Sequence, residues 1–162
     1  MIKSLVLGGG CFWGMQELFC SQIGVVKTTA GYSGGEVLNP TYKNHKGHAE
    51  VIKIDYDTQK TSFVNLLDFF FRIHNPTTLN RQGNDIGDSY RSVIFYNDES
   101  EKLEALKFID IVNKSGRWES LVVTKLEKFT SFTKAEDYHQ DYLQKNPQGY
   151  TCHFVRGGGY LV

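Results

Sequence analysis

Apolar and polar positions follow two different periods along this chain, and the change of period separates strands from helices. Large apolar side chains in the stretch 61–74 are spaced three and four residues apart, as in an amphipathic helix lying on a core: Phe63, Leu66, Leu67, Phe70 and Phe71. Apolar or alternating runs predict strands at residues 2–8, 24–30, 48–56, 90–96 and 121–127. Further helices are predicted at residues 11–22, 98–114 and 133–145.

Two polar stretches, 31–47 and 75–89, are rich in turn-forming residues and are predicted to be irregular loops. Loops longer than about 12 residues in a compact domain usually carry function. The last segment, 146–162, contains Pro147 and three consecutive glycines. We therefore expect a long, flexible coil tail that lies over the surface.

The predicted helix 133–145 opens with Thr133, and Glu136 follows three positions later, as in a capping box. The elements run in the order β-α-β-β-α-β-α-β-α, with two strands that no helix separates. This order predicts an α+β fold, in which helices pack on a single mixed sheet. The closest plan is the ferredoxin-like two-layer sandwich.

The composition describes one globular domain without a strong charge field. Lys+Arg and Asp+Glu number 18 each among 162 residues, so no basic surface is expected to attract nucleic acid. A strand follows Met1 almost at once, which leaves no room for a signal peptide, and no apolar run approaches the ~20 residues of a membrane span. We expect a cytoplasmic protein, and because nothing demands a dimer, a monomer.

A glycine-rich run with one cysteine follows the first predicted strand: Gly8-Gly9-Gly10-Cys11-Phe12-Trp13-Gly14. Cys11 stands where a helix begins, and the unpaired N–H groups of a first helical turn stabilise an anion. We expect this thiol to ionise below its ordinary pKa of about 8.5. The pair Phe12-Trp13 adds an apolar surface, which favours a substrate with a small apolar group on an electrophilic atom. The plain alternative is a small buried core residue.

The other two cysteines have different expectations. Three cysteines without a CxxC pair indicate neither a disulfide framework nor a zinc site. Cys20 lies in the same predicted helix as Cys11, on the opposite face and ~13 Å away, so a structural role is expected. Cys152 lies in the tail, either as an ordinary exposed thiol or as a resolving cysteine for an oxidised Cys11.

Glu50 interrupts an apolar strand face. Alternate residues of a strand share a face, so Glu50 points the same way as Ile52 and Ile54. A carboxyl group on such a covered face is desolvated, which raises its pKa and lets it donate a proton. The alternative is a glutamate at the end of the strand, in solvent.

Further polar candidates lie at the two long loops: Tyr32, Tyr42, Asp85, Asp88 and Tyr90. The tyrosines are ordinary packing residues unless both loops converge on Cys11. The histidines show no metal-ligand spacing, since His45 and His48 lie on a loop without a matching pair. His74 or His139 would be the base in a cysteine hydrolase, but no pattern places either beside the thiol.

Nine sequence blocks follow one another in the order of a known family. The first is Gly10-Cys11-Phe12-Trp13-Gly14, and the other eight are residues 31–35, 39–42, 47–51, 74–77, 81–87, 90–92, 136–140 and 145–150. With these blocks the chain resembles peptide methionine sulfoxide reductase A along nearly its whole length.

The resemblance implies a nucleophile, a pocket and a resolving thiol. Cys11 would attack the sulfoxide sulfur of methionine S-sulfoxide, free or protein-bound, and become a sulfenic acid. Phe12 and Trp13 would hold the methyl group of the substrate. Cys152 would form a disulfide with Cys11, and thioredoxin would reduce it without any cofactor.

The resemblance also implies the groups that handle the sulfoxide oxygen. Glu50 would be the protonated acid, Tyr42 and Tyr90 hydroxyl donors, and Asp85 a residue that organises the site. The chain departs from many members in a shorter loop after Tyr42, without the cysteine that some carry there. No second cysteine follows Cys152, so the disulfide is expected to be reduced directly.

Three other classes would use parts of this pattern. A thiol peroxidase needs a positive residue near the thiolate and no methyl pocket, which the pair Phe12-Trp13 disfavours. A cysteine hydrolase needs a histidine base and forms no disulfide. A non-catalytic module that recognises oxidised methionine has no need of an activated Cys11.

Overall fold

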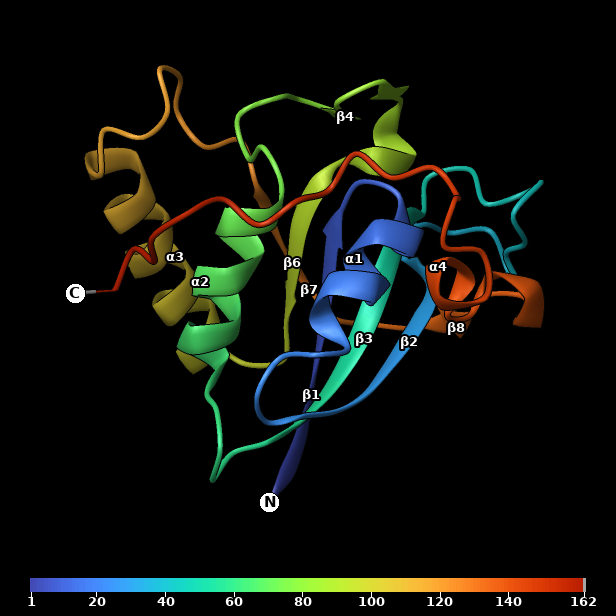
Figure 1. Ribbon diagram of the computed structural model, residues 1–162, viewed down its shortest axis with the longest axis horizontal. Coiled ribbons are helices and arrows are strands. Elements are labelled where there is room, and N and C mark those ends of the chain that lie inside the picture. Colours follow the sequence, from blue (N-terminus) through green and yellow to red (C-terminus); the bar gives the residue numbers. More distant parts are fainter. Residues whose placement is uncertain (162) are drawn as a thin grey trace.

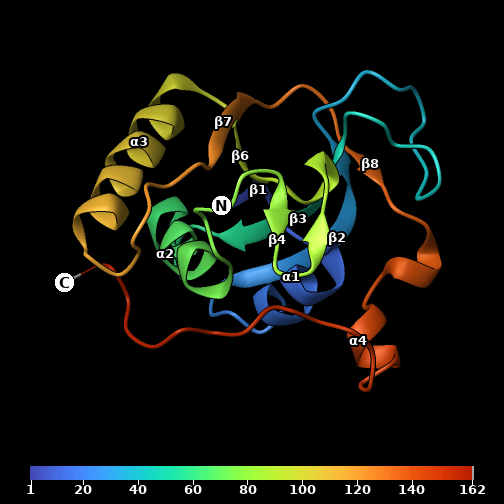
Figure 2. The same ribbon diagram turned by 90° about the horizontal axis from the view of Figure 1, so that it is seen from above.

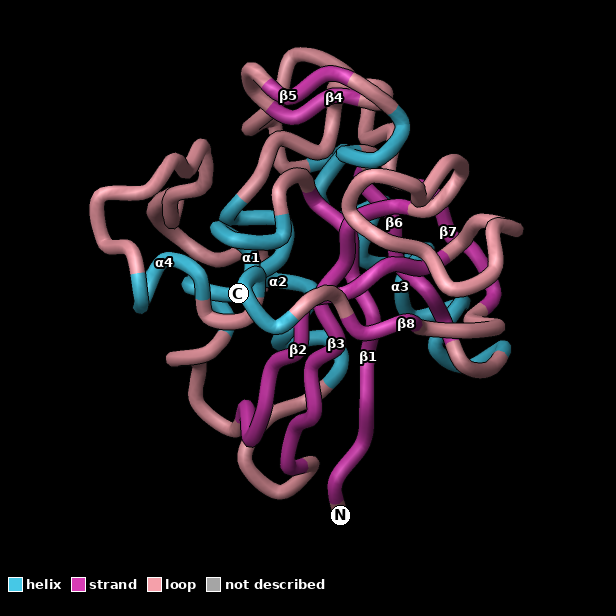
Figure 3. Tube along the Cα trace, turned by 90° about the vertical axis from the view of Figure 1, so that its right-hand side faces the viewer, coloured by secondary structure: helices cyan, strands magenta, loops and turns pink. Residues whose placement is uncertain are grey.

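The computed structural model describes residues 1–161, and a six-stranded sheet in the order β7-β6-β1-β3-β2-β8 forms its centre (Figure 1). The strands of this sheet are β1 (Ile2–Gly9), β2 (Val25–Ser33), β3 (Ala49–Asp57), β6 (Ser92–Tyr96), β7 (Lys125–Lys128) and β8 (Thr133–Lys134). A separate antiparallel hairpin pairs β4 (Arg81–Gln82) with β5 (Asp85–Ile86). Figure 3 shows this hairpin among the loops beyond one end of the sheet.

Neighbouring strands of the sheet run antiparallel except β6 and β7, which are parallel. The predicted α+β class with one mixed sheet is therefore confirmed. Strands β6, β1, β3 and β2 take this order from a β-α-β-β-α-β stretch of chain, and β7 and β8 extend the sheet at its two edges. The ferredoxin-like label stays a prediction.

Helices α1 (Phe12–Phe19) and α2 (Phe63–Ile73) lie against one face of the sheet, and α3 (Glu99–Lys114) packs beside α2 (Figure 2). The stripe predicted for α2 is confirmed, because all five of its apolar residues are buried. Burying one such side chain contributes roughly 1.5–3 kcal/mol. Within residues 1–161, none of the helices is long and apolar enough to cross a membrane.

The two faces of the sheet carry separate hydrophobic clusters. Leu7, Ile52 and Ile54 belong to the larger one, which lies beneath the helices. Val51 and Phe95 belong to a smaller cluster on the opposite face, against which loop residues pack. The alternation predicted for the strand around Glu50 is therefore confirmed.

The predicted helix 133–145 is wrong. Thr133 lies in the edge strand β8 and pairs with Tyr32 of β2. The Glu136 carboxylate accepts hydrogen bonds from the Tyr32 hydroxyl at 2.9 Å and from the Tyr42 N–H at 3.0 Å, so it closes no capping box. Long-range partners thus replace the local contacts that a helix start needs.

What remains of that helix is a 3₁₀ turn, η2 (Asp137–His139), and one helical turn, α4 (Tyr142–Lys145). Asp141 separates them with a φ of 53°, in the left-handed region. A second 3₁₀ turn, η1 (Asp88–Tyr90), precedes β6 and delays its start to Ser92.

Residues 146–161 form the predicted coil, drawn in red across α1 and α2 in Figure 1. The buried His153 ring donates from Nε2 to the Gly9 carbonyl at 2.6 Å. Further along, the Tyr160 N–H donates to Asp68 at 2.6 Å. These contacts hold the segment that carries Cys152 beside the start of α1, while its flexibility stays a prediction.

Candidate active site

Four strand ends meet at one end of the sheet. The end of β1 pairs with the start of β6 at Gly9 and Ser92, and the end of β2 pairs with the start of β3 at Tyr32 and Glu50. The first long loop joins β2 to β3 at this end, and the second leads from α2 into the start of β6. The loops that carry Tyr42 and Tyr90 therefore converge on the segment that follows Gly9, as a role for these tyrosines at Cys11 requires.

Cys11 is the N-cap residue of α1 and is buried. The chain enters this position through Gly10, whose φ of 103° is one that L side chains rarely adopt. A Cβ atom at Gly10 would also stand 2.7 Å from the Gln82 side chain. The glycine is therefore required both by the turn and by the close packing beneath it.

Glu50 is 1% exposed and accepts a hydrogen bond from the Phe12 N–H at 3.1 Å, the first amide of α1. Burial raises the pKa of this carboxyl to about 8, the Phe12 N–H lowers it, and the charge of Asp85 raises it. The desolvated acid predicted on this strand face is thus present, and it is hydrogen-bonded to the residue that follows Cys11.

The low pKa expected for Cys11 is wrong. Burial raises the pKa of this thiol above its ordinary value, the charge of Glu50 raises it further, and the Trp13 N–H opposes them. The first N–H of the helix is engaged by the carboxyl of Glu50. The effect of desolvation on the pKa of Cys11 is therefore larger than the effect of the helix start. A sequence pattern does not reveal how strongly a side chain is desolvated.

An apolar and aromatic cluster lies beside Cys11. Phe12 is buried, with ring centroids 5.7 Å from Tyr32 and 5.0 Å from His139. Trp13 is half-buried and stacks on Tyr142 at 3.7 Å with an interplanar angle of 9°. These rings form an aromatic cluster at the first turn of α1, directly after Cys11.

Tyr42 and Tyr90 approach the same centre from the two loops. Burial raises the pKa of both phenols, and the charges of Glu50 and Cys11 raise it further. Both hydroxyls therefore stay protonated at neutral pH and lie within electrostatic reach of the thiol and the acid. The Asp85 carboxyl, whose pKa burial raises, accepts from the Tyr150 hydroxyl at 3.3 Å.

Cys152 lies above the hairpin, with its sulfur 3.9 Å from the Gln82 carbonyl oxygen and 4.0 Å from Asp85 Oδ2. Its charge contributes to the raised pKa of Cys11, and the side chains of Thr151 and His153, on either side of it in the sequence, lie against Gly14 of α1. Cys20 is placed elsewhere: its thiol donates to the Glu17 carbonyl at 3.2 Å. A structural role for Cys20 agrees with this position.

The histidines proposed as bases have other partners. Nδ1 of the buried His74 donates to the Phe70 carbonyl at 2.6 Å, and Nε2 accepts from the Ser92 hydroxyl at 2.8 Å. Burial lowers the pKa of His74 to about 3. No group of three His, Cys, Asp or Glu side chains within residues 1–161 is arranged to hold a metal ion.

Sequence reasoning missed how His139 and Glu136 serve the site. His139 accepts from the Trp13 indole N–H at 2.9 Å, and Glu136 binds the Tyr42 backbone. Both residues lie in the motif at 136–140, where their polar character was visible. Their partners were not, because those partners lie far away in the sequence.

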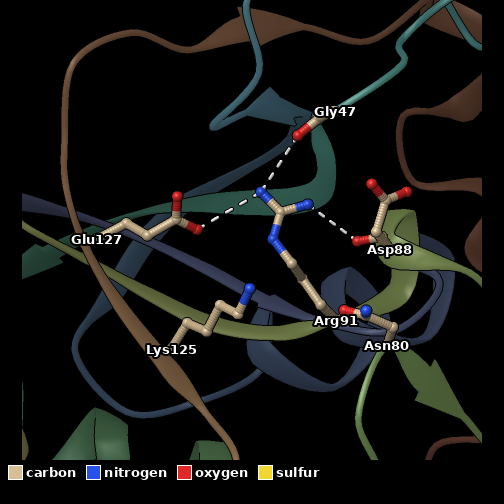
Figure 4. Close-up of a pocket in the computed structure, with 6 residues that line it drawn as sticks. All are labelled: Gly47, Asn80, Asp88, Arg91, Lys125 and Glu127. Atoms are coloured by element: carbon tan, nitrogen blue, oxygen red, sulfur yellow. Dashed lines mark hydrogen bonds and ion pairs between the residues drawn. The ribbon is translucent and has the colours of Figure 1, made fainter.

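A cavity of about 280 Å³ lies next to the loops and is lined by Gly47, Asn80, Asp88, Arg91, Lys125 and Glu127 (Figure 4). The Arg91 guanidinium donates to the carbonyls of Asp88 at 2.9 Å and Gly47 at 3.3 Å. It also lies 3.4 Å from Glu127. Of the candidate residues taken from the sequence, Asp88 alone lines this cavity. Arg91 joins the ends of the two loops there.

A buried thiol, a protonated acid, two phenols and an apolar surface suit a substrate with a polar oxygen and a small apolar group on one atom. The acid and phenols can donate hydrogen bonds to the oxygen while the thiol attacks the atom that bears it. The nearby second thiol suits a two-step exchange that ends in a disulfide.

Comparison with known proteins agrees with this chemistry. The family model for peptide methionine sulfoxide reductase matches residues 3–159. Peptide methionine sulfoxide reductase MsrA of Mycolicibacterium gilvum is 57% identical over 159 residues, which cover 98% of this chain and 94% of that protein.

Solved structures are similar as well. The crystal structure of reduced Mxr1 from Saccharomyces cerevisiae matches with a TM-score of 0.90 and 36% identity, covering 96% of this chain and 93% of that one. Mxr1 in complex with Trx2 matches with a TM-score of 0.68 and 25% identity, covering 96% and 91%. The chain therefore belongs to the peptide methionine sulfoxide reductase family.

Proposed function

We propose that Cys11 reduces the S epimer of methionine sulfoxide, free or in oxidised proteins, and that Glu50 is the acid of this step. The observation that carries the proposal is the hydrogen bond from the first amide of α1 to a buried Glu50 carboxyl whose pKa is about 8, directly beside Cys11. A sulfoxide is a poor electrophile until its oxygen is protonated or strongly hydrogen-bonded.

The first step transfers the sulfoxide oxygen to Cys11. The sulfoxide oxygen accepts hydrogen bonds from Glu50, Tyr42 and Tyr90, which leaves its sulfur more positive and stabilises the Cys11 thiolate. A sulfur–sulfur bond forms while the oxygen takes a proton from Glu50. The resulting hydroxyl then moves from the substrate sulfur to the Cys11 sulfur, which breaks the S–O bond of the substrate and the new sulfur–sulfur bond. The products are methionine and a Cys11 sulfenic acid, and Glu50 regains the proton that the thiol lost.

The methyl group lies against Phe12 and Trp13 in this proposal. Their position beside the thiol gives the substrate an orientation as well as an apolar contact. Asp85 organises the opposite side, through the contacts that it makes with Tyr150 and with the sulfur of Cys152.

The second step regenerates the enzyme. The Cys152 thiol attacks the sulfenic sulfur of Cys11, a disulfide forms and water leaves. Thioredoxin then reduces the disulfide, so two electrons from its dithiol balance each sulfoxide reduced. The solved complex of the relative Mxr1 with Trx2 supports this partner.

The proposal also covers the organisation and location of the chain. The chain acts as one catalytic domain, and residues 146–161 form a tail flexible enough to bring Cys152 to Cys11. Residue 162, which the sequence-based prediction included in this tail, lies outside the described residues. It works in the cytoplasm as a monomer, and thioredoxin replaces any bound cofactor as the source of electrons.

A coupled assay with thioredoxin on separated R and S methionine sulfoxides tests the function. Consumption of the reductant is expected with the S epimer alone. Equal rates with both epimers, or turnover with the R epimer alone, would contradict the proposal.

A further inference from the structure

One peptide group in the first loop is fixed at both of its polar atoms. The oxygen of the Thr41–Tyr42 peptide accepts from Nδ1 of His45 at 2.9 Å and from the Asn44 N–H at 3.1 Å. The N–H of the same peptide donates to Glu136 Oε2 at 3.0 Å. Because these bonds fix the plane of the peptide, they also fix the Tyr42 N–Cα bond, at the end of which its side chain leaves the backbone.

The same imidazole reaches the second loop. Since the Thr41 carbonyl can only accept, Nδ1 of His45 carries a proton, and in the neutral ring Nε2 accepts from the Ser89 hydroxyl at 2.8 Å. Ser89 directly precedes Tyr90. The His45 side chain thus joins the carbonyl that precedes Tyr42 to the hydroxyl of the residue that precedes Tyr90.

Tyr32 anchors this arrangement to the sheet. Its fully buried ring stacks on His45 with centroids 4.9 Å apart, and its hydroxyl donates to Glu136 Oε1 at 2.9 Å. Tyr32 lies in β2 and pairs with Glu50 of β3. His45 and Glu136, which hold the Tyr42 peptide, therefore both contact Tyr32. Tyr32 is in turn the strand partner of the proposed acid.

We infer that His45 and Glu136 are positioning residues, which set the place of the Tyr42 hydroxyl relative to Tyr90 and Glu50. This inference rests on the proposed role of Tyr42 as a donor to the sulfoxide oxygen. Neither residue has to touch the substrate, because each acts on the Thr41–Tyr42 peptide. A misplacement of about 1 Å in an active site costs up to 10²-fold in rate, so roughly tenfold is expected here.

A double-mutant cycle separates positioning from general support. Full-length enzyme is mixed with methionine S-sulfoxide without reductant, and the rate of the first methionine release is measured. His45→Ala and Glu136→Gln should each slow it about tenfold when Tyr42 is present. In a Tyr42→Phe background the same changes should cost less than twofold, because no hydroxyl remains to be placed.

Three further variants sharpen the cycle. His45→Asn, whose amide can still donate to the Thr41 carbonyl, should recover part of the rate. Lys46→Ala, an exposed side chain in the same loop, should leave the rate unchanged. Where His45→Ala does not fold, Glu136→Gln and Ser89→Ala carry the test, because both nearly conserve volume.

The outcomes are distinguishable. Equal losses in the Tyr42 and Tyr42→Phe backgrounds would assign a general structural role and overturn the inference, as would full activity of His45→Ala and Glu136→Gln. If Tyr42→Phe alone leaves the rate unchanged, the proposed role of Tyr42 fails and the inference falls with it. Losses confined to the Tyr42 background support it.

Discussion

The carboxyl of Glu50 is buried in the core and yet bonded to the first helical N–H beside Cys11. Burial makes its ionisation costly, the N–H favours ionisation, and the balance raises its pKa to about 8. A carboxylic acid that is still protonated at neutral pH can donate to a sulfoxide oxygen, which a solvated glutamate does not do.

Replacing Glu50 tests its role as an acid. General acid catalysis is typically worth 10²–10⁴-fold, so Glu50→Ala should slow the first methionine release by about that factor. Glu50→Gln should retain more activity, because an amide still donates a hydrogen bond although it transfers no proton. Undiminished single-turnover rates in both variants would remove Glu50 from the mechanism.

The protonation state of Glu50 should also control sulfoxide binding. In Cys11→Ser the thiol no longer titrates, and calorimetry can follow the binding of unreacted methionine S-sulfoxide. Only protonated Glu50 donates to the oxygen, so affinity should be full below pH 7 and fall as pH rises through about 8. The matched variant Cys11→Ser with Glu50→Gln should bind independently of pH. If the affinity of the single variant Cys11→Ser did not change with pH, Glu50 would not be the acid.

Among the elements, α1 and the C-terminal coil depend on each other. The coil passes over the first turn of α1, where Gly14 has no side chain and the Thr151 and His153 side chains take its place. Cys152 lies between these two residues in the sequence, so this packing places its thiol near the start of the helix.

Gly14→Ala should therefore impair the resolving step. Its Cβ would stand 2.6 Å from Thr151 Oγ1 and closer still to the His153 ring, so the coil must shift. We expect the Cys11–Cys152 disulfide to form at least tenfold more slowly, as misplacement of a reacting group predicts. Gly157→Ala is the matched control, because among residues 1–161 no atom beyond its chain neighbours lies within 4 Å of its added Cβ. The rate of disulfide formation is measured by quenched thiol labelling. An unchanged rate in Gly14→Ala would refute this coupling.

The elements that the sequence predicted well are those with local causes. The stripe of α2 and the alternation around Glu50 follow from periodic burial, and both are confirmed. The helix predicted at 133–145 failed because Glu136 bonds to Tyr32 and Tyr42, which no local pattern reveals.

The same distinction applies to the site. The motifs marked Cys11, Glu50 and the tyrosine loops, since each combines a reactive side chain with a recognisable local element. The raised pKa of Cys11 and the bond from Trp13 to His139 arise from burial and from contacts across the fold. Such properties belong to the assembled molecule.

For the whole molecule, a buried acid makes stability depend on pH. The folded-state pKa of about 8 lies above the unfolded value of 4.5, so the folded protein binds the extra proton between these values. The stability that Glu50 contributes is present below pH 4.5 and is lost as pH rises to about 8. Urea unfolding should show this loss as about 1.4 kcal/mol per pH unit.

Glu50→Gln should remove that slope between pH 5 and 8, whereas the exposed control Glu119→Gln should keep it. Identical slopes in wild type and Glu50→Gln would mean that Glu50 ionises without penalty in the folded protein.

The central claim is that Cys11 takes the sulfoxide oxygen and Cys152 resolves it. Its most direct measurement mixes the enzyme with excess methionine S-sulfoxide without reductant, then counts methionine and maps the oxidised cysteines. Wild type should release one methionine per chain and hold a Cys11–Cys152 disulfide. Cys152→Ser should release one and hold a Cys11 sulfenic acid, and Cys11→Ser should release none. Methionine from Cys11→Ser, or a wild-type disulfide that excludes Cys152, would contradict the account.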